Sequence, residues 1–578
     1  MTLVVRPFAL PLILATALAL IPGCGRDEEA DFTYGVRDEH IFLDPQKISW
    51  VTDSRVADCL FEPLLDYSAA DLTLEPAAAE SWELSDDART YTFHLRPEAR
   101  WSNGDPVRAS DFVFAWKRAI VPDFAADYTQ LMFCIQGARE FFDWRTAQLQ
   151  DFAARGQSAD AAWDEAQRKF RESVGLSAPD DHTLVVTLQR PIAYFLDLCA
   201  FVTFMPVHET SVRPTVGLNR QTGMLTRDDN YWTDPKRLVS NGPYRLARRR
   251  FKRDLLLVAN EHYWNREAMG NGSIQERIIH EPQSALLAYE NGTVHWLPDL
   301  PTASPVAADL VKEKRADVHL QQMAGVYFYN FNCRRTLVDG TANPLADPRV
   351  RRALAMAIDR DTIVQKVTRL NQPVVRSFVP PDAVPGYDPP TETGPGFDPE
   401  AAAGLLAEAG YPGGRGLGGL SILYNSGFGH ESIAQAIKRM WEQHIGVFVT
   451  LEGIEVKAFS QRLKTQDYTI CRASWFGDYR DPTTWLEKMM TGNGNNDCAY
   501  SNPDYDALLH RAATQTDPAE RFSTLREAEA LMLADSPMAM IFQYIALHVY
   551  DPGIVQGLHN NAWNRWRLEF VKVGEGGP

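Results

Sequence analysis

Apolar and polar residues alternate along several short segments of the chain, and other segments repeat apolar residues at helical spacing. Alternation predicts strands, because successive side chains of a strand point to opposite faces. The predicted strands are 91–95, 182–188, 255–259, 447–451, 468–475 and 538–550. The predicted helices are a helix capped by Ser110 or Asp111 that continues to Arg118, and the segments 141–172, 348–368, 399–409, 431–444, 504–513 and 519–533. Their interleaving indicates a mixed α/β protein with several sheets.

The first thirty residues predict export. Arg6 is the only charged residue before Arg26, and 8–21 is almost wholly apolar. That run is too short to span a membrane and is typical of a secretory signal peptide. Residues 21–24 (IPGC) resemble a lipobox, in which the Cys becomes the lipidated first residue. We therefore expect a signal peptide over 1–23, lipidation at Cys24 and a tether over 24–31. The alternative is a plain secretory signal with an incidental Cys.

Composition excludes some classes of function. The 58 Lys and Arg are outnumbered by 75 Asp and Glu, for a net charge of -17, which argues against nucleic acid as a partner. The six Cys beyond Cys24 are scattered without a CxxC pair, so a zinc or redox site is not expected. Buried free thiols are the default expectation, with one bridge possible. The length of 578 residues suggests about three or four domains.

Chemical motifs give no positive case for catalysis. The chain contains no HExxH, P-loop or GxSxG pattern. Residues 414–419 (GRGLGG) match GxGxxG but follow a predicted helix, so a flexible loop is expected there. Residues 491–497 (TGNGNND) are rich in oxygen ligands but lack EF-hand spacing, so a polar surface loop is expected. No nucleophile, base and orienting group assemble from the sequence. We expect no enzyme activity, no cofactor and no metal.

One long segment resembles a known family. Residues 76–118 read PAAAESWELSDDARTYTFHLRPEARWSNGDPVRASDFVFAWKR. This is similar to the signature segment of the peptide-binding family of extracellular solute receptors that serve ABC importers. The similarity continues at 239–244 (VSNGPY), 349–360 (RVRRALAMAIDR) and 475–482 (WFGDYRDP), and covers nearly all of the mature chain. The last segment is more similar to oligopeptide receptors than to sugar-, nickel- or heme-binding relatives.

The resemblance implies a fold and a place. The family fold is a two-lobed α/β periplasmic-binding-protein fold (type II, cluster C-like) with an extra domain inserted in the first lobe. The expected division is 32–62, 196–323 and 546–578 for lobe I, 63–195 for the inserted domain and 324–545 for lobe II. The resemblance also implies a monomer in the periplasm or on the extracellular face of the membrane. Its lobes close on a ligand, and its partners are short peptides and the permease subunits of the importer.

The resemblance also implies a binding site, because a receptor for peptides of any sequence must bind the groups that all peptides share. Backbone strand addition is expected on two sides of the ligand. A carboxylate is expected for the α-ammonium, and cations for the α-carboxylates of ligands of different length. The matching residues are Ser49, Trp50 and Val51 on one side, Ser474, Trp475 and Phe476 on the other, Asp478 for the ammonium, and Arg472 and His430 for the carboxylate.

Departures and alternatives stay open at this point. Segment 141–172 is longer than usual, so an extra helical element is expected. Oligopeptide receptors can carry a disulfide beside the cleft, but the matching positions here are Gly325 and Phe476. Arg472 and His430 are alternatively surface residues, and Trp475 a core residue. The alternative functions are binding of another solute, such as a murein peptide or a metal chelate, a peptide hydrolase, and a chaperone or adhesin.

Overall fold

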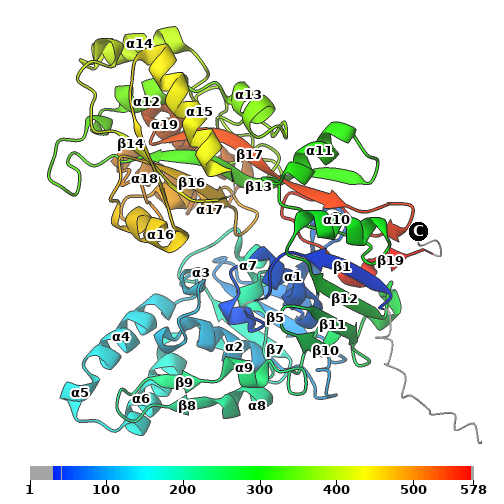
Figure 1. The fold of residues 1–578 in the computed structure, drawn as a ribbon. Coiled ribbons are helices and arrows are strands. Elements are labelled where there is room, and N and C mark those ends of the chain that lie inside the picture. The colour runs from blue at the N-terminus through cyan, green and yellow to red at the C-terminus, as the bar shows by residue number, and fades with distance from the viewer. Residues whose placement is uncertain (1–29, 41, 428, 575–578) are drawn as a thin grey trace, which may run out of the picture.

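The computed structural model describes residues 30–40, 42–427 and 429–574, so the expected signal peptide and Cys24 lie outside the described residues. Two lobes lie one above the other in Figure 1, each built around its own sheet. In lobe I the strand order is β1 (Phe32–Val36), β12 (Ser273–Ile278), β11 (Asp254–Ala259) and β10 (Tyr244–Arg250). In lobe II the order is β15 (Thr450–Ile454), β14 (Ser421–Asn425), β16 (Ile470–Phe476), β13 (Val318–Phe331) and β17 (Met538–Val549).

A third sheet packs against lobe I. Its strands are β4 (Ala79–Leu84), β5 (Thr90–Leu95), β7 (Thr183–Thr187) and β6 (Leu176–Ser177). Phe93 of this sheet, Trp116 of α2 (Ala109–Ile120) and Phe32 of lobe I belong to one continuous buried cluster. The remaining elements beside these two sheets are α1 (Val51–Leu60), β2 (Leu65–Tyr67), β3 (Leu74–Pro76), α3 (Thr129–Met132), α7 (Phe195–Cys199), α8 (Glu209–Val212), β8 (Val216–Leu218), β9 (Leu225–Arg227), α9 (Asp229–Trp232), α10 (Pro282–Glu290) and α11 (Pro305–Glu313).

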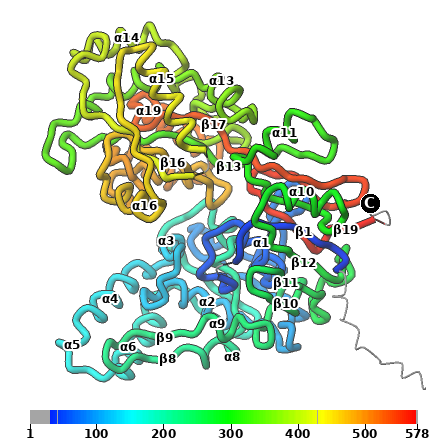
Figure 2. Tube along the Cα trace, viewed as in Figure 1, coloured from blue at the N-terminus to red at the C-terminus, as the bar shows by residue number. Residues whose placement is uncertain are grey.

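Segment 141–172 is helical, as expected, and forms three helices that extend away from the sheets in Figure 2: α4 (Ala138–Gln150), α5 (Phe152–Arg155) and α6 (Ala159–Ser173). Fully buried Arg145 fixes the first of them, because its guanidinium donates to both oxygens of Asp123 at 2.8 and 3.0 Å.

Helices cover both faces of the lobe II sheet. Successive side chains of β13 point to opposite faces and therefore pack against different helices. Tyr327 and Tyr329 pack with the first group of helices, whereas Val326 and Phe328 pack with the second. The first group is α12 (Pro348–Met356), α14 (Pro399–Glu408) and α15 (His430–Ile445), and the second is α18 (Pro503–Ala512) and α19 (Pro518–Asp535). Two further helices are α16 (Val456–Thr465) and α17 (Thr483–Leu486).

The strands β13 and β17 run from lobe II to lobe I (Figure 1). In lobe II, 326–330 of β13 pairs with 538–543 of β17, and nearer lobe I, 318–322 pairs with 545–549. The register shifts between Gln322 and Val326. Val549 then exchanges both backbone hydrogen bonds with Leu297, which ties the ladder to lobe I. After β17 the chain stays with lobe I, where β18 (Val555–Gln556) pairs with β19 (Lys572–Val573).

Two predicted elements are wrong in extent. The single helix expected over 348–368 ends at Met356, because Asp359 caps a new short helix, α13 (Arg360–Thr362), that continues as a π-helix over Ile363–Val367. The strand expected over 447–451 begins three residues later, because α15 ends on Gly446 in the left-handed region. The six cysteines of the described chain are free, and the Cys333 amide donates to the Cys498 carbonyl at 2.8 Å. No helix among the described residues is both long enough and apolar enough to cross a membrane.

Candidate functional site

A cavity of about 770 Å³ lies between the lobes. Lobe I contributes Trp50 and Asp299 to its lining, and lobe II contributes His430, Arg472 and aromatic residues of β13, β16 and β17. The carboxylate of Asp299 is already paired with Arg55 at 2.8 Å. Residues from both lobes therefore surround one space whose lobe II wall is cationic and aromatic.

One strand of this wall has an open edge. Among the described strands, β14 pairs with β16 only at Ile470 and Cys471, so the rest of that side of β16 faces no partner strand. On the other side, the amide of Gly477 donates to Ala324 of the β13 segment at 2.9 Å. Because backbone groups alternate in direction along a strand, those of Phe476 and Ser474 point toward the open edge. An extended ligand can add there as a further strand.

The side chains of β16 divide between two faces. Arg472, Ser474 and Phe476 line the cavity. Trp475 points to the other face, where it packs with the second helix group and its indole N–H donates to Thr484 O at 2.8 Å. The Trp475 ring therefore packs against the core of lobe II, as the alternative interpretation expected, and does not line the cavity.

A cationic group marks one end of the open edge. The Arg472 guanidinium donates to the Tyr544 hydroxyl at 2.7 Å and lies 5.0 Å from the centre of the Tyr327 ring. Its buried Nε atom has no hydrogen-bond partner in the described structure. No carboxylate of the described chain pairs with Arg472, and a desolvated guanidinium without a counter-ion favours an anion. The surface alternative for Arg472 is wrong.

His430 lies beside this guanidinium at the start of α15. It is buried, and its Nδ1 is 3.2 Å from the Tyr327 hydroxyl. Burial, and then the charge of Arg472, lower the pKa of His430 to about 3. The imidazole is therefore neutral at physiological pH and offers a hydrogen bond rather than a charge. The surface alternative for His430 is also wrong.

A carboxylate marks the other end of the open edge. Asp478 lies two residues beyond β16, where its amide donates to Thr484 Oγ1 at 2.9 Å. The hydroxyl of Tyr128, which precedes α3 on the lobe I side, donates to its carboxylate at 3.2 Å. Burial raises the pKa of Asp478 to about 6, although the Tyr128 hydrogen bond opposes the shift. No cation of the described residues is paired with Asp478.

The segment expected on the lobe I side is extended only in part. The backbone of Trp50 is extended, but Val51 is the first residue of α1, so the expectation of a continuous strand over Ser49, Trp50 and Val51 is wrong. The Trp50 carbonyl already accepts the Ser54 amide at 3.0 Å within that helix. Of the three residues only Trp50 lines the cavity, and Ser49 instead donates to Asp127 at 2.7 Å.

Gly325 and Phe476 stand directly opposite each other on β13 and β16. A Cβ atom at Gly325 would lie 2.3 Å from the Phe476 ring. The ring therefore occupies the space above the glycine, at the positions where the resemblance places a disulfide in other receptors.

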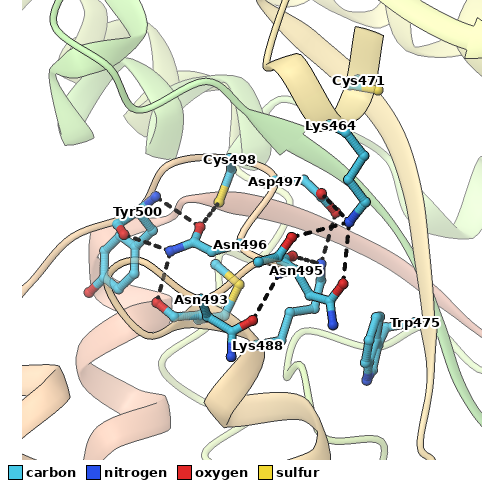
Figure 3. A network of polar contacts seen from close by, with 12 residues as sticks. Lys464, Cys471, Trp475, Lys488, Asn493, Asn495, Asn496, Asp497, Cys498 and Tyr500 are labelled. Carbon is cyan, nitrogen blue, oxygen red and sulfur yellow. Dashed lines mark hydrogen bonds and ion pairs between the residues drawn. The ribbon is translucent and has the colours of Figure 1, made fainter. Parts of the chain in front are cut away.

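The loop 491–497 is exposed at Thr491, Gly492 and Gly494, as expected of a polar surface loop, but its last two residues, Asn496 and Asp497, are buried. Figure 3 shows two lysines directed at Asp497: buried Lys488 bonds one carboxylate oxygen and Lys464 the other, each at 3.0 Å. Lys488 also donates to the Asn495 carbonyl and lies 4.8 Å from the Trp475 ring. The Lys488 ammonium therefore lies among the oxygen atoms of this loop. Among the described residues no group of three His, Cys, Asp or Glu could hold a metal.

Comparison with known proteins assigns the family. Residues 73–497 match the bacterial extracellular solute-binding proteins, family 5 Middle. The chain belongs to this family of solute-binding proteins.

Curated relatives agree with the family assignment. The chain is 31% identical to the oligopeptide-binding protein OppA of Bacillus subtilis, over 84% of this chain and 82% of that protein. It is 30% identical to the periplasmic murein peptide-binding protein MppA of Escherichia coli, over 89% and 88%.

Solved structures of this family match the whole arrangement. The unliganded open form of MppA superposes with a TM-score of 0.73 at 27% identity, covering 94% of this chain and 98% of that one. Haemophilus influenzae OppA in complex with RPPGFSPFR gives 0.71 at 28% identity, covering 95% and 99%. The two-lobed α/β fold expected from the sequence is confirmed.

The residues of the candidate site that sequence analysis missed include Tyr327 and Tyr544, which line the cavity, and Tyr128, which contacts Asp478. Single tyrosines carry no spacing signal. Tyr544 does follow the alternation of β17, which places it on the same face as Phe542, but only the fold brings that face to Arg472.

We expect Lys488→Met to lower the free energy of unfolding by about 3 kcal/mol, because it leaves a buried carboxylate and carbonyl without their ammonium. Lys464→Met is the matched control, since it removes a half-exposed partner of the same Asp497 and should cost less than about 1 kcal/mol. Urea unfolding measures both. Equal losses in the two variants would show that Lys488 is not the ion around which the loop folds.

Proposed function

We propose that this protein captures short peptides by their backbone and termini and delivers them to the permease of an ABC importer. The observation that carries the proposal is the pair of uncompensated charges, Asp478 and Arg472, at the two ends of the open edge of β16. A peptide presents an ammonium, an extended backbone and a carboxylate in that order. With its ammonium at Asp478 and its carboxylate at Arg472 the peptide runs antiparallel to β16, as β13 does on the other side of that strand.

The relatives support this ligand class. Two of the curated relatives are named for oligopeptide and murein peptide binding, and one of the matching structures holds a nine-residue peptide. Murein peptides are the second candidate ligand, because MppA is as similar to this chain as OppA is. The family is one of solute receptors, and we propose that this chain likewise binds its ligand without chemical change.

We propose closure of the lobes as the response to ligand, with lobe I formed by 32–62, 196–323 and 546–578, the inserted domain by 63–195 and lobe II by 324–545. One of the two register shifts of the crossing strands supports this division, because it falls between Gln322 and Val326 of β13, opposite 543–545 of β17. An irregular ladder bends more readily than a regular one. A closed, ligand-selected state is what a permease would read.

We also propose that the mature protein is a monomer anchored by a lipid at Cys24 to the periplasmic or extracellular face of a membrane. The IPGC sequence at 21–24 supports this. Fractionation of cells that express Cys24→Ser should find the protein released from the membrane fraction, and retention there would contradict the anchor.

We expect a tripeptide with a free amino terminus to bind far more tightly than its N-acetylated form. Acetylation removes the charge that Asp478 requires and leaves the carboxylate buried and unpaired. Asp478→Ala should weaken the free peptide by about 2–5 kcal/mol, which is roughly thirtyfold to several thousandfold. Calorimetric titration measures both effects. Equal affinity for the free and acetylated peptides would remove the proposed role of Asp478 and weaken the assignment of peptides as ligands.

Affinity should also depend on pH. The pKa of Asp478 is about 6 in the empty cleft, so the carboxylate is ionised at about pH 7.5 and mostly protonated at about pH 5. Binding an ammonium requires the ionised form, so affinity should fall about tenfold as the pH falls across that window. His430, with a pKa of about 3, stays neutral throughout. Asp478→Asn should bind weakly and without this dependence; an unchanged pH profile in the variant would assign the titration to another group.

A further inference from the structure

Two large apolar side chains are exposed inside the cleft. Trp50 on the lobe I side is 61% exposed, and Phe476 on the lobe II side is 42% exposed. Both line the 770 Å³ cavity, from opposite lobes. Exposed aromatic residues that line one cavity from two lobes predict an apolar occupant.

Phe476 is the outer end of a row of aromatic rings on the cavity face of the lobe II sheet. Its ring centre lies 4.8 Å from that of Tyr544, which lies 5.7 Å from that of Phe542. Phe542 in turn stacks on Tyr327 at 4.8 Å. All four rings line the cavity, but the inner rings, Tyr327 and Phe542, are buried, so Phe476 and Tyr544 form the more accessible part of the row.

Both exposed rings of this row are held in place. Gly325 opens the space under the Phe476 ring, since a Cβ atom there would lie 2.3 Å from it. The Tyr544 hydroxyl accepts a hydrogen bond from Arg472 at 2.7 Å. The positions of the Phe476 and Tyr544 rings are therefore fixed by the protein itself, without a bound ligand.

The register of the proposed ligand strand decides which of its side chains meets this surface. The backbone groups of Phe476 and Ser474 point to the open edge, so they face alternate residues of the ligand. If the ammonium is at Asp478, the first residue stands opposite Phe476 and the third opposite Ser474. Directly opposed residues in antiparallel strands place their side chains on the same face. The second residue points to the opposite face.

We propose that Phe476, Tyr544 and Trp50 form a subsite that selects peptides whose first residue carries an aromatic side chain. This inference rests on the proposed function and adds a side-chain preference to it. Phe476 and Tyr544 provide the wall, and Trp50 covers it when the lobes close. Burial of a phenyl ring and its contacts with neighbouring rings supply the selectivity.

Calorimetric titration with four tripeptides tests the subsite: Ala-Ala-Ala, Phe-Ala-Ala, Ala-Phe-Ala and Ala-Ala-Phe. We expect Phe-Ala-Ala to bind about ten- to a hundredfold more tightly than Ala-Ala-Ala. Ala-Phe-Ala should differ from Ala-Ala-Ala by less than about threefold, since its ring points away. Ala-Ala-Phe should gain less than Phe-Ala-Ala, because its ring stands beside Ser474.

Variants assign the preference to the rings. In Phe476→Ala and in Trp50→Ala the advantage of Phe-Ala-Ala, taken as the ratio of its affinity to that of Ala-Ala-Ala for the same variant, should shrink at least about fivefold. Phe476→Leu still covers Gly325 with an apolar side chain, and it should keep part of the advantage of Phe-Ala-Ala. This variant takes the place of Phe476→Ala in the test if Phe476→Ala is poorly folded. Phe448→Ala, at a residue that is 70% exposed and outside the cavity, should leave all four affinities unchanged.

The outcomes separate this inference from the proposed function. Equal binding of all four peptides would overturn the aromatic subsite and leave the peptide receptor standing. A preference for Ala-Phe-Ala would overturn the register, and with it the subsite. A full preference retained in both Phe476→Ala and Trp50→Ala would overturn the assignment to these rings. Failure of all four peptides to bind would overturn the proposed function and the subsite together.

Discussion

The pairing of β13 with β17 joins the two halves of the molecule. It begins in the centre of the lobe II sheet and ends against Leu297 of lobe I, so any movement of one lobe relative to the other bends this ladder. The ladder is irregular at two places, between Gln322 and Val326 and between Tyr327 and Phe328. The first lies nearer lobe I, and we propose that the ladder bends there. The same two strands carry Tyr327 and Tyr544, so the proposed hinge and the wall of the cavity belong to one piece of sheet.

The site on that sheet is built from charges that the protein does not satisfy by itself. Arg472 and Asp478 are the ends of a row along β16, and neither has an oppositely charged partner in the described structure. Two other buried charges are paired, Arg145 with Asp123 and Lys488 with Asp497, whereas Arg360 and Glu529 are hydrogen-bonded to neutral groups. If the lobes close as we propose, unpaired charges raise the free energy of the empty closed state. A ligand with two termini would remove that cost and so couple recognition to closure.

The sequence predicts much of this, in proportion to how local each signal is. Long helices such as α15 and α19 and the long apolar strand β17 are predicted within a few residues, because the pattern of each extends over ten or more residues. The break of the helix expected over 348–368 depends on a cap at Asp359 inside an apolar repeat, which periodicity does not register. Arg472, His430, Phe476 and Asp478 are found through family resemblance, not through spacing.

The remaining site residues depend on tertiary structure. The division of β16 into cavity and core faces follows from alternation, yet only the packed helices reveal that Trp475 is on the core side. Tyr128 reaches Asp478 from 350 positions away in the chain, and no local pattern encodes that contact. The burial of Asp497 at the end of the loop 491–497 is missed for a similar reason, because its partners Lys488 and Lys464 lie outside the loop.

The most direct test of the account is a crystal structure of the protein with a bound tripeptide. The account predicts closed lobes, with the ammonium of the peptide at Asp478, its carboxylate at Arg472, and its backbone running antiparallel to β16 with hydrogen bonds to Ser474 and Phe476. A peptide bound with its termini reversed, or bound away from the open edge of β16, would contradict it.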